Sequence, residues 1–158
     1  MNPYLKQYQT NQIQTASPER ILIMLYDGAI QFLNIAKNEM TSDVKPLNIQ
    51  KIHNNIIGAQ KIITEFQCTL NLEIGGEMAQ NLYDLYTYLY QKLVHANIKK
   101  DVSAIDEVLE HLKELKTTWL KAIEIAQKEK STKSLVEYES EDDNADDEDD
   151  VYEKALKD

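Results

Sequence analysis

The sequence predicts an all-α protein: an antiparallel, up-down-up-down four-helix bundle with an N-terminal arm and a disordered, acidic C-terminal tail. Glycine and proline supply only seven of the 158 residues, roughly a third of their usual share of about 12%. A sheet of many strands needs more turn residues than this. Apolar residues instead recur at helical spacing in four segments, and 42% of all residues are hydrophobic, which is enough for one core.

Composition divides the chain into an arm (residues 1–16), a bundle domain (residues 17–130) and a tail (residues 131–158). The arm is polar apart from Tyr4, Leu5, Tyr8 and Ile13, and its apolar residues show no sustained period. It is therefore not expected to form part of the core.

The first helix is expected from Pro18 to about Met40. Ser17 supplies a capping hydroxyl, Pro18 fits the first helical position, and Glu19 places a negative charge in the first turn. One apolar stripe carries Leu22, Leu25, Ala29, Phe32, Ala36 and Met40, and a second stripe beside it carries Ile23, Tyr26, Ile30 and Leu33. This helix is therefore apolar over a wide arc.

The second helix is expected to begin near Pro46 and to end before the break at Gly75 and Gly76. Its heptad stripe carries Ile49, Ile52, Ile56, Ala59, Ile63, Phe66 and Leu70. Gly58 lies in the middle of this helix and costs about 1 kcal/mol relative to alanine. Either the close packing of a neighbour or simple tolerance explains this glycine, and we favour tolerance.

The third helix is expected from about Gly76 to Asn97, and the fourth ends near Lys128–Lys130. Asp101 and Ser103 are both candidate caps for the fourth helix. Its heptad stripe carries Ile105, Val108, Leu112, Leu115, Trp119, Ala122 and Ala126. Short connections between long helices favour an antiparallel order.

Most of the net charge of −10 belongs to the tail. Residues 131–158 contain twelve acidic residues and three lysines, so residues 1–130 have a net charge of only −1. Ten of the fourteen residues from Glu137 to Asp150 are acidic, and such a run is typical of a solvated, disordered segment. The charge excludes the basic surface that binds nucleic acid or anionic membranes.

No set of residues indicates catalysis, a metal or a cofactor. A di-iron bundle needs Glu-x-x-His pairs, which none of His53, His95 and His111 completes. His53 is followed by Ile56 and Ile57 where phosphotransfer bundles have lysine and glycine. A phosphotransfer or metal-dependent bundle therefore remains only the alternative function.

The sequence contains features expected of a soluble protein of a reducing, cytoplasmic compartment. It has one cysteine, Cys68, and neither an apolar signal segment at the start nor a transmembrane stretch. We therefore expect no membrane insertion.

An excess of tyrosine points to a binding surface. The chain has nine tyrosines against two phenylalanines, and tyrosine combines a large apolar ring with a tip that tolerates water. Tyr83, Tyr86 and Tyr90 either flank the core or, together with the stripe of Ile23, Tyr26 and Ile30, line a groove for partner helices.

Several segments, in order, resemble the flagellar export chaperone FliS family. The most specific are residues 15–22, Thr-Ala-Ser-Pro-Glu-Arg-Ile-Leu, and residues 24–29, Met-Leu-Tyr-Asp-Gly-Ala. Further matches are Gly75-Gly76-Glu77, Leu82-Tyr83, Leu85-Tyr86, Ala96-Asn97 before Asp101, and Leu115 with Trp119. The resemblance covers about residues 4–125, and the acidic tail has no counterpart in the family pattern.

The resemblance implies a cytoplasmic chaperone, not an enzyme, that binds the C-terminal helical segment of flagellin. It would prevent premature polymerisation and deliver flagellin to the type III export gate, with other flagellar regulators as further partners. The family also uses its arm as a lid over the client groove, a role that Tyr4, Tyr8 and Ile13 match. The free chain is expected to be a monomer or a weak dimer.

Overall fold

The computed structural model describes residues 16–155, with side chains described as far as Ser140. It contains four helices: α2 (Pro18–Met40), α3 (Ile49–Thr69), α4 (Leu72–Lys99) and α5 (Val102–Ala155). No strand occurs within residues 16–155. The predicted all-α fold with four helices is confirmed.

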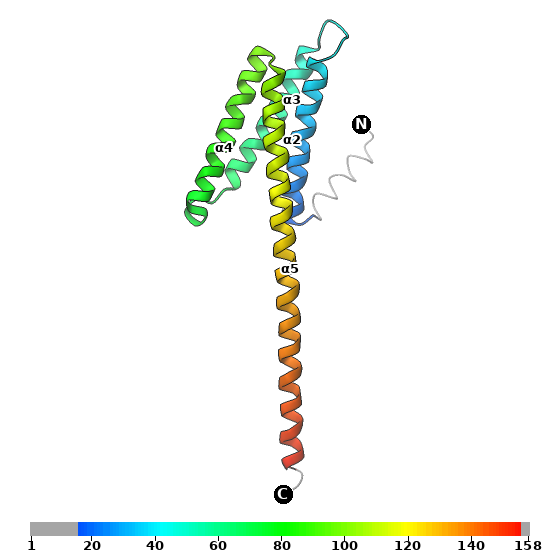
Figure 1. The fold of residues 1–158 in the computed structure, drawn as a ribbon, viewed down its shortest axis with the longest axis vertical. Coiled ribbons are helices and arrows are strands. Elements are labelled where there is room, and N and C mark those ends of the chain that lie inside the picture. Colours follow the sequence, from blue (N-terminus) through cyan, green and yellow to red (C-terminus); the bar gives the residue numbers. More distant parts are fainter. Residues whose placement is uncertain (1–15, 156–158) are drawn as a thin grey trace. The chain divides into compact units, whose positions relative to one another are not determined.

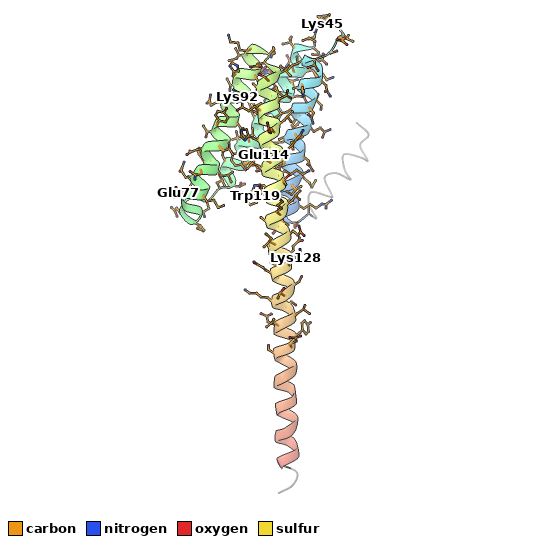
Figure 2. All side chains as sticks on the ribbon, viewed as in Figure 1. Lys45, Glu77, Lys92, Glu114, Trp119 and Lys128 are labelled. Atoms are coloured by element: carbon orange, nitrogen blue, oxygen red, sulfur yellow. The ribbon has the colours of Figure 1, made fainter. Side chains whose placement is uncertain are left out.

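The chain divides into two units, Met1–Thr118 and Trp119–Asp158, which we call the bundle unit and the C-terminal unit. The bundle unit contains α2, α3, α4 and the first part of α5, and these helices alternate in direction (Figure 1). Lys45, between α2 and α3, and Glu77, near the start of α4, lie at opposite ends of this unit (Figure 2).

The start of α2 follows the sequence prediction. The Ser17 hydroxyl oxygen accepts a hydrogen bond from the Arg20 main-chain N–H at 3.3 Å, and Pro18 occupies the first turn. The helix ends at Met40, as predicted.

The start of α3 lies at Ile49, slightly beyond the predicted Pro46. Asn48 caps the helix, because its side-chain oxygen accepts a hydrogen bond from the Lys51 main-chain N–H at 3.0 Å. The Asn48 N–H donates to the Glu39 carboxylate at 2.9 Å, and this bond lowers the pKa of Glu39. The end of α2 and the start of α3 are thereby tied together.

The turn between α3 and α4 contains a helical segment before the double glycine. Asn71 caps α4 by accepting a hydrogen bond from the Ile74 N–H at 3.1 Å, so the helix starts at Leu72 instead of near Gly76. The backbone then bends at Gly76, where φ is 55° and ψ is −135°. Only glycine adopts this conformation without strain.

Asp101 is the cap of α5. Its carboxylate accepts hydrogen bonds from the main-chain N–H of Ser103 at 2.9 Å and from the Ser103 hydroxyl at 2.6 Å. These bonds lower the pKa of Asp101. The preceding Lys100 lies in the left-handed region, with φ of 52°, and terminates α4.

Contacts between α3 and α4 show that these helices are antiparallel. The Gln60 side chain bonds to the Tyr90 carbonyl, and the Gln67 side chain bonds to the Tyr83 carbonyl. A step of seven residues forward on α3 is therefore matched by seven residues backward on α4.

Ion pairs show the same relation between α2 and α5. Lys37 pairs with Asp106 at 2.6 Å, and Asp27 pairs with Lys116 at 2.5 Å. These pairs lie at the edge of the bundle unit and are partly exposed, so each contributes only about 0–1 kcal/mol. These pairs show that α2 and α5 are antiparallel, but they contribute little to the stability of the bundle unit.

The core of the bundle unit is built mainly from the predicted heptad positions. Buried apolar side chains come from all four helices and include Tyr26, Ala29, Leu33, Ala36, Ile52, Ile56, Ala59, Ile63, Phe66, Tyr86, Leu89, Leu93, Ala96, Ile105, Val108 and Leu112. The first position of the predicted α3 stripe departs from the prediction, since Ile49 is 53% exposed.

Two glycines, one on α2 and one on α3, lie against side chains of the facing helix. A methyl group on Gly28 would lie 3.4 Å from the Ile62 side chain, whereas one on Gly58 would lie 3.0 Å from three ring atoms of Phe32. The Phe32 ring therefore packs on the backbone of α3 at Gly58. The prediction that Gly58 is merely tolerated is wrong, because the absent side chain makes room for this ring.

The helix α5 extends past the predicted end of the fourth helix. It reaches Ala155 instead of ending near Lys130. All side chains from Glu124 to Ser140 are exposed, so no core holds this part of the helix. The prediction of the helix end weighed burial and charge repulsion, whereas Leu, Lys, Glu and Ala have high helix propensity without burial. The Glu124–Lys128 pair at 3.2 Å supports the helix just before Lys130.

The two helical glycines give a matched pair of stability predictions. Gly28→Ala should raise the free energy of unfolding by about 0.5–1 kcal/mol, because alanine favours the helix and the new methyl group makes an ordinary contact. Gly58→Ala should gain less or lose stability, because the Phe32 ring must move. Urea denaturation followed by circular dichroism measures both, and equal gains would contradict this packing of Phe32.

Replacement of Gly76, the glycine at the bend, should change the free energy of unfolding in the opposite direction to Gly28→Ala. Gly76→Ala should lower the free energy of unfolding by about 1–2 kcal/mol, because a side chain is strained at this positive φ. No heavy atom lies within 4 Å of the new methyl position, so backbone strain alone would cause the loss. A neutral or stabilising result in the same urea assay would show that the bend is not required.

Candidate functional site

The structure separates the predicted binding residues into several places. Tyr4, Tyr8 and Ile13 lie outside the described residues. The other six lie on α2 and α4. Two are in the core, two are beside α5, and two are along the contact between α3 and α4.

Tyr26 and Tyr86 lie in the core and do not line a groove. Tyr26 is fully buried and Tyr86 is 2% exposed. Both rings pack on Phe66, with centroid distances of 4.3 Å from Tyr26 and 5.3 Å from Tyr86. Their hydroxyl groups share a hydrogen bond of 2.5 Å, so their polar tips are satisfied without reaching the surface. Their assignment as partner-contacting residues is therefore corrected.

Ile23 and Ile30 are half-buried on α2. They flank Asp27 at helical spacing, and Asp27 pairs with Lys116 of α5. This stripe of α2 therefore lies beside α5 and remains partly exposed.

Tyr83 and Tyr90 lie on α4 along its contact with α3. Tyr83 is 37% exposed and Tyr90 is half-buried. Their main-chain carbonyls accept hydrogen bonds from Gln67 at 3.2 Å and from Gln60 at 3.4 Å. These two tyrosines are the predicted site residues that the structure places on a common surface.

A ladder of polar contacts along this surface was missed by the sequence prediction. Besides the two glutamines, His53 of α3 accepts a hydrogen bond at Nδ1 from the Asn97 side chain at 2.9 Å. His53, Gln60 and Gln67 are seven residues apart, and this spacing of polar residues beside the isoleucine stripe is the signal that could have revealed the ladder.

A groove of about 450 Å³ lies beside this ladder. Its lining consists of Ile57, Gln60, Lys61, Ile62, Thr64, Glu65 and Tyr90. Gln60 is only 5% exposed, while the exposed Lys61 and Glu65 place opposite charges at the rim. Apolar walls with a few polar groups are typical of a groove that holds an amphipathic helix.

A second exposed apolar area lies at the start of α4. Ile74 and Met78 are 86% and 82% exposed, and Leu72 is 42% exposed. These residues surround the bend at Gly76.

The contact between α4 and α5 carries a polar cluster that is not suited to proton transfer. The Tyr88 hydroxyl donates to Glu107 at 2.6 Å, and Lys92 pairs with the same carboxylate at 3.1 Å. These bonds lower the pKa of Glu107 and raise the pKa values of Tyr88 and Lys92. Each group is thus held more firmly in its ordinary ionisation state (Lys92 is labelled in Figure 2).

The described residues show no metal centre and no membrane helix. Within residues 16–140, no group of three or more histidine, cysteine or acidic side chains could hold a metal ion. Among the helices that the structure describes, none is long and apolar enough to span a bilayer.

Sequence comparison identifies the family. The family model described as flagellar protein FliS matches residues 1–127. The flagellar secretion chaperone FliS of Bacillus subtilis is 34% identical over 129 residues, which are 82% of this chain and 92% of that protein. FliSB of Pseudomonas aeruginosa is 36% identical over 120 residues, covering 73% and 91% of the two chains.

Structural comparison supports the fold. A crystal structure of a bacterial flagellar chaperone superposes with a TM-score of 0.61 at 19% identity, covering 77% of this chain and 98% of the other. The family match and the curated relatives together establish that the chain belongs to the FliS family of flagellar secretion chaperones.

Proposed function

We propose that this chaperone binds the C-terminal helical segment of flagellin in the groove between α3 and α4. The observation that carries the proposal is the apolar groove lined by Ile57, Thr64 and Tyr90, which is open on the surface of the bundle unit. Tyr83 and the apolar residues at the start of α4 continue the contact surface. Ile23 and Ile30 supply a separate contact along α2.

Binding would keep flagellin from polymerising in the cytosol and would present it to the type III export apparatus. The flagellin segment would become helical on binding, so apolar burial must offset the cost of ordering it. The export gate and other flagellar regulators are the further partners of the complex. The activity requires neither a cofactor nor a bond-making step.

The groove can be tested with two matched threonines. Thr64 lines the groove on α3, whereas Thr117 lies on α5 outside the groove lining, and both are exposed. Each hydroxyl donates to the carbonyl four residues earlier, at 3.1 Å and 3.0 Å. The two positions therefore differ in location more than in local structure.

Thr64→Arg should weaken binding of a flagellin C-terminal peptide about tenfold, or about 1.4 kcal/mol, because a large charged group enters the groove. Thr117→Arg should change the affinity by less than about twofold, as expected for a residue outside the interface. Calorimetric titration measures the affinity, and circular dichroism reports the helix gained by the peptide. Equal affinities for the two variants would refute the position of the groove, while absence of binding by the natural chain would refute flagellin as the client.

We also propose that the arm covers part of the groove until flagellin displaces it. The proposal is supported by the isolated apolar residues Tyr4, Tyr8 and Ile13 in an otherwise polar segment. Deletion of residues 1–14 should raise peptide affinity and lower the solubility of the free chain, because the groove would be permanently uncovered. A deletion that changes neither the titration curve nor the solubility limit would exclude the lid.

A further inference from the structure

One face of α5 in the C-terminal unit carries no charged residue over nearly three heptads. The stripe consists of Leu120, Ile123, Gln127, Ser131, Ser134 and Tyr138. These positions are three or four residues apart and therefore share one side of the helix. The seven charged residues between Leu120 and Tyr138 all lie at other positions.

The stripe is apolar at its two ends and polar in its middle. Leu120 is 45% exposed and Tyr138 is 72% exposed, and Leu135 at the edge of the stripe is 65% exposed. In the middle, the Ser131 hydroxyl donates to the Gln127 carbonyl at 3.1 Å. The stripe spans about 28 Å at 1.5 Å per residue.

We propose that this stripe binds the same stripe of a second copy of the chain, with the two helices antiparallel. A twofold axis near Glu129 places Leu120 opposite Tyr138, and Ile123 opposite Leu135. The two polar positions, Gln127 and Ser131, then face each other at the centre. With Leu135 in place of its neighbour Ser134, the positions are spaced alike from both ends (steps of 3, 4, 4, 4 and 3 residues), as a two-fold, self-complementary contact requires. A polar pair inside an apolar seam fixes its register.

The distribution of charge favours the antiparallel orientation. Residues 137–150 carry ten acidic residues and no basic residue. Parallel helices would place these two acidic stretches side by side, whereas antiparallel helices move them to opposite ends. Like charges repel at this separation, so the acidic stretch acts against parallel pairing.

Lysines beside the stripe keep the contact weak. Lys128 and Lys130 flank its centre, so each approaches its counterpart across the twofold axis, although Glu124 partly neutralises Lys128 at 3.2 Å. Salt screens this repulsion. Added salt should therefore strengthen the dimer, whereas it weakens a contact made by opposite charges.

The stripe begins inside the family match, which ends at residue 127, and continues past it to Tyr138. The proposed dimer does not depend on the flagellin groove. Lys128 marks the helix segment that carries the stripe in Figure 2.

Sedimentation equilibrium of the full chain tests the proposal. Interfaces of standard size reach micromolar affinity or better. This shorter seam should therefore give a dimer with a micromolar or weaker dissociation constant. Leu120→Lys with Tyr138→Lys should abolish the dimer. Ile125→Lys with Val136→Lys is the matched control, because these residues are each 59% exposed on the opposite face, and it should leave the dimer unchanged.

Circular dichroism of each variant shows whether the helix is retained. A natural chain that stays monomeric up to about 1 mM, the concentration scale of the weakest specific contacts, would overturn the proposal. So would equal effects of the two lysine pairs, or weakening of the dimer by salt.

Disulfide trapping tests the orientation in a Cys68→Ser background, which removes the exposed natural thiol. A mixture of Leu120→Cys and Tyr138→Cys chains should form a mixed disulfide dimer, while neither variant alone should form one. Rapid disulfide formation by Leu120→Cys alone would show a parallel pair and would overturn the antiparallel arrangement.

Discussion

The hydrogen bond between the buried hydroxyls of Tyr26 and Tyr86 constrains how the helices of the bundle unit meet. A buried polar group without a partner costs about 1–3 kcal/mol, so each hydroxyl must lie within reach of the other. Phe66 lies against both rings, at centroid distances of 4.3 Å and 5.3 Å. One aromatic residue from each of α2, α3 and α4 therefore sets the relative height of these three helices.

The two contacts made by α3 differ in character because of what surrounds this aromatic centre. Toward α2, the Phe32 ring lies on the backbone at Gly58, and this close approach leaves little space between the helices. Toward α4, side chains such as Gln67 bridge to main-chain carbonyls and to the Thr87 hydroxyl. Long polar side chains hold helices farther apart than glycine does, and the groove lies on this side of α3.

The net charge of the chain is concentrated in its C-terminal residues, not in the residues that line the groove. Residues 1–130 are nearly neutral, while residues 131–158 carry a net charge of −9. The proposed groove lies on a nearly neutral unit, so binding there would depend chiefly on apolar burial, which salt changes little. In the proposed dimer, repulsion between the acidic parts of α5 favours the antiparallel orientation.

The local features of this protein follow from neighbouring residues and could be predicted. Helix starts at Pro18 and near Asp101 depend on a few neighbouring residues and their capping bonds, and the heptad positions of α3 follow from spacing alone. The family could likewise be identified from short motifs such as residues 15–22. The helix beyond Lys130 was missed because the prediction weighed burial and repulsion above intrinsic propensity.

Long-range packing determines which apolar stripe faces inward and which glycine makes a contact. Tyr83 and Tyr86 are neighbours on the same helix, yet the first is 37% exposed and the second is buried. Spacing places both on adjoining faces of α4, but the orientation of that helix depends on the partner available to the Tyr86 hydroxyl, which is Tyr26, sixty residues earlier. Such long-range pairings leave no trace in local sequence, because they arise when separate helices pack together.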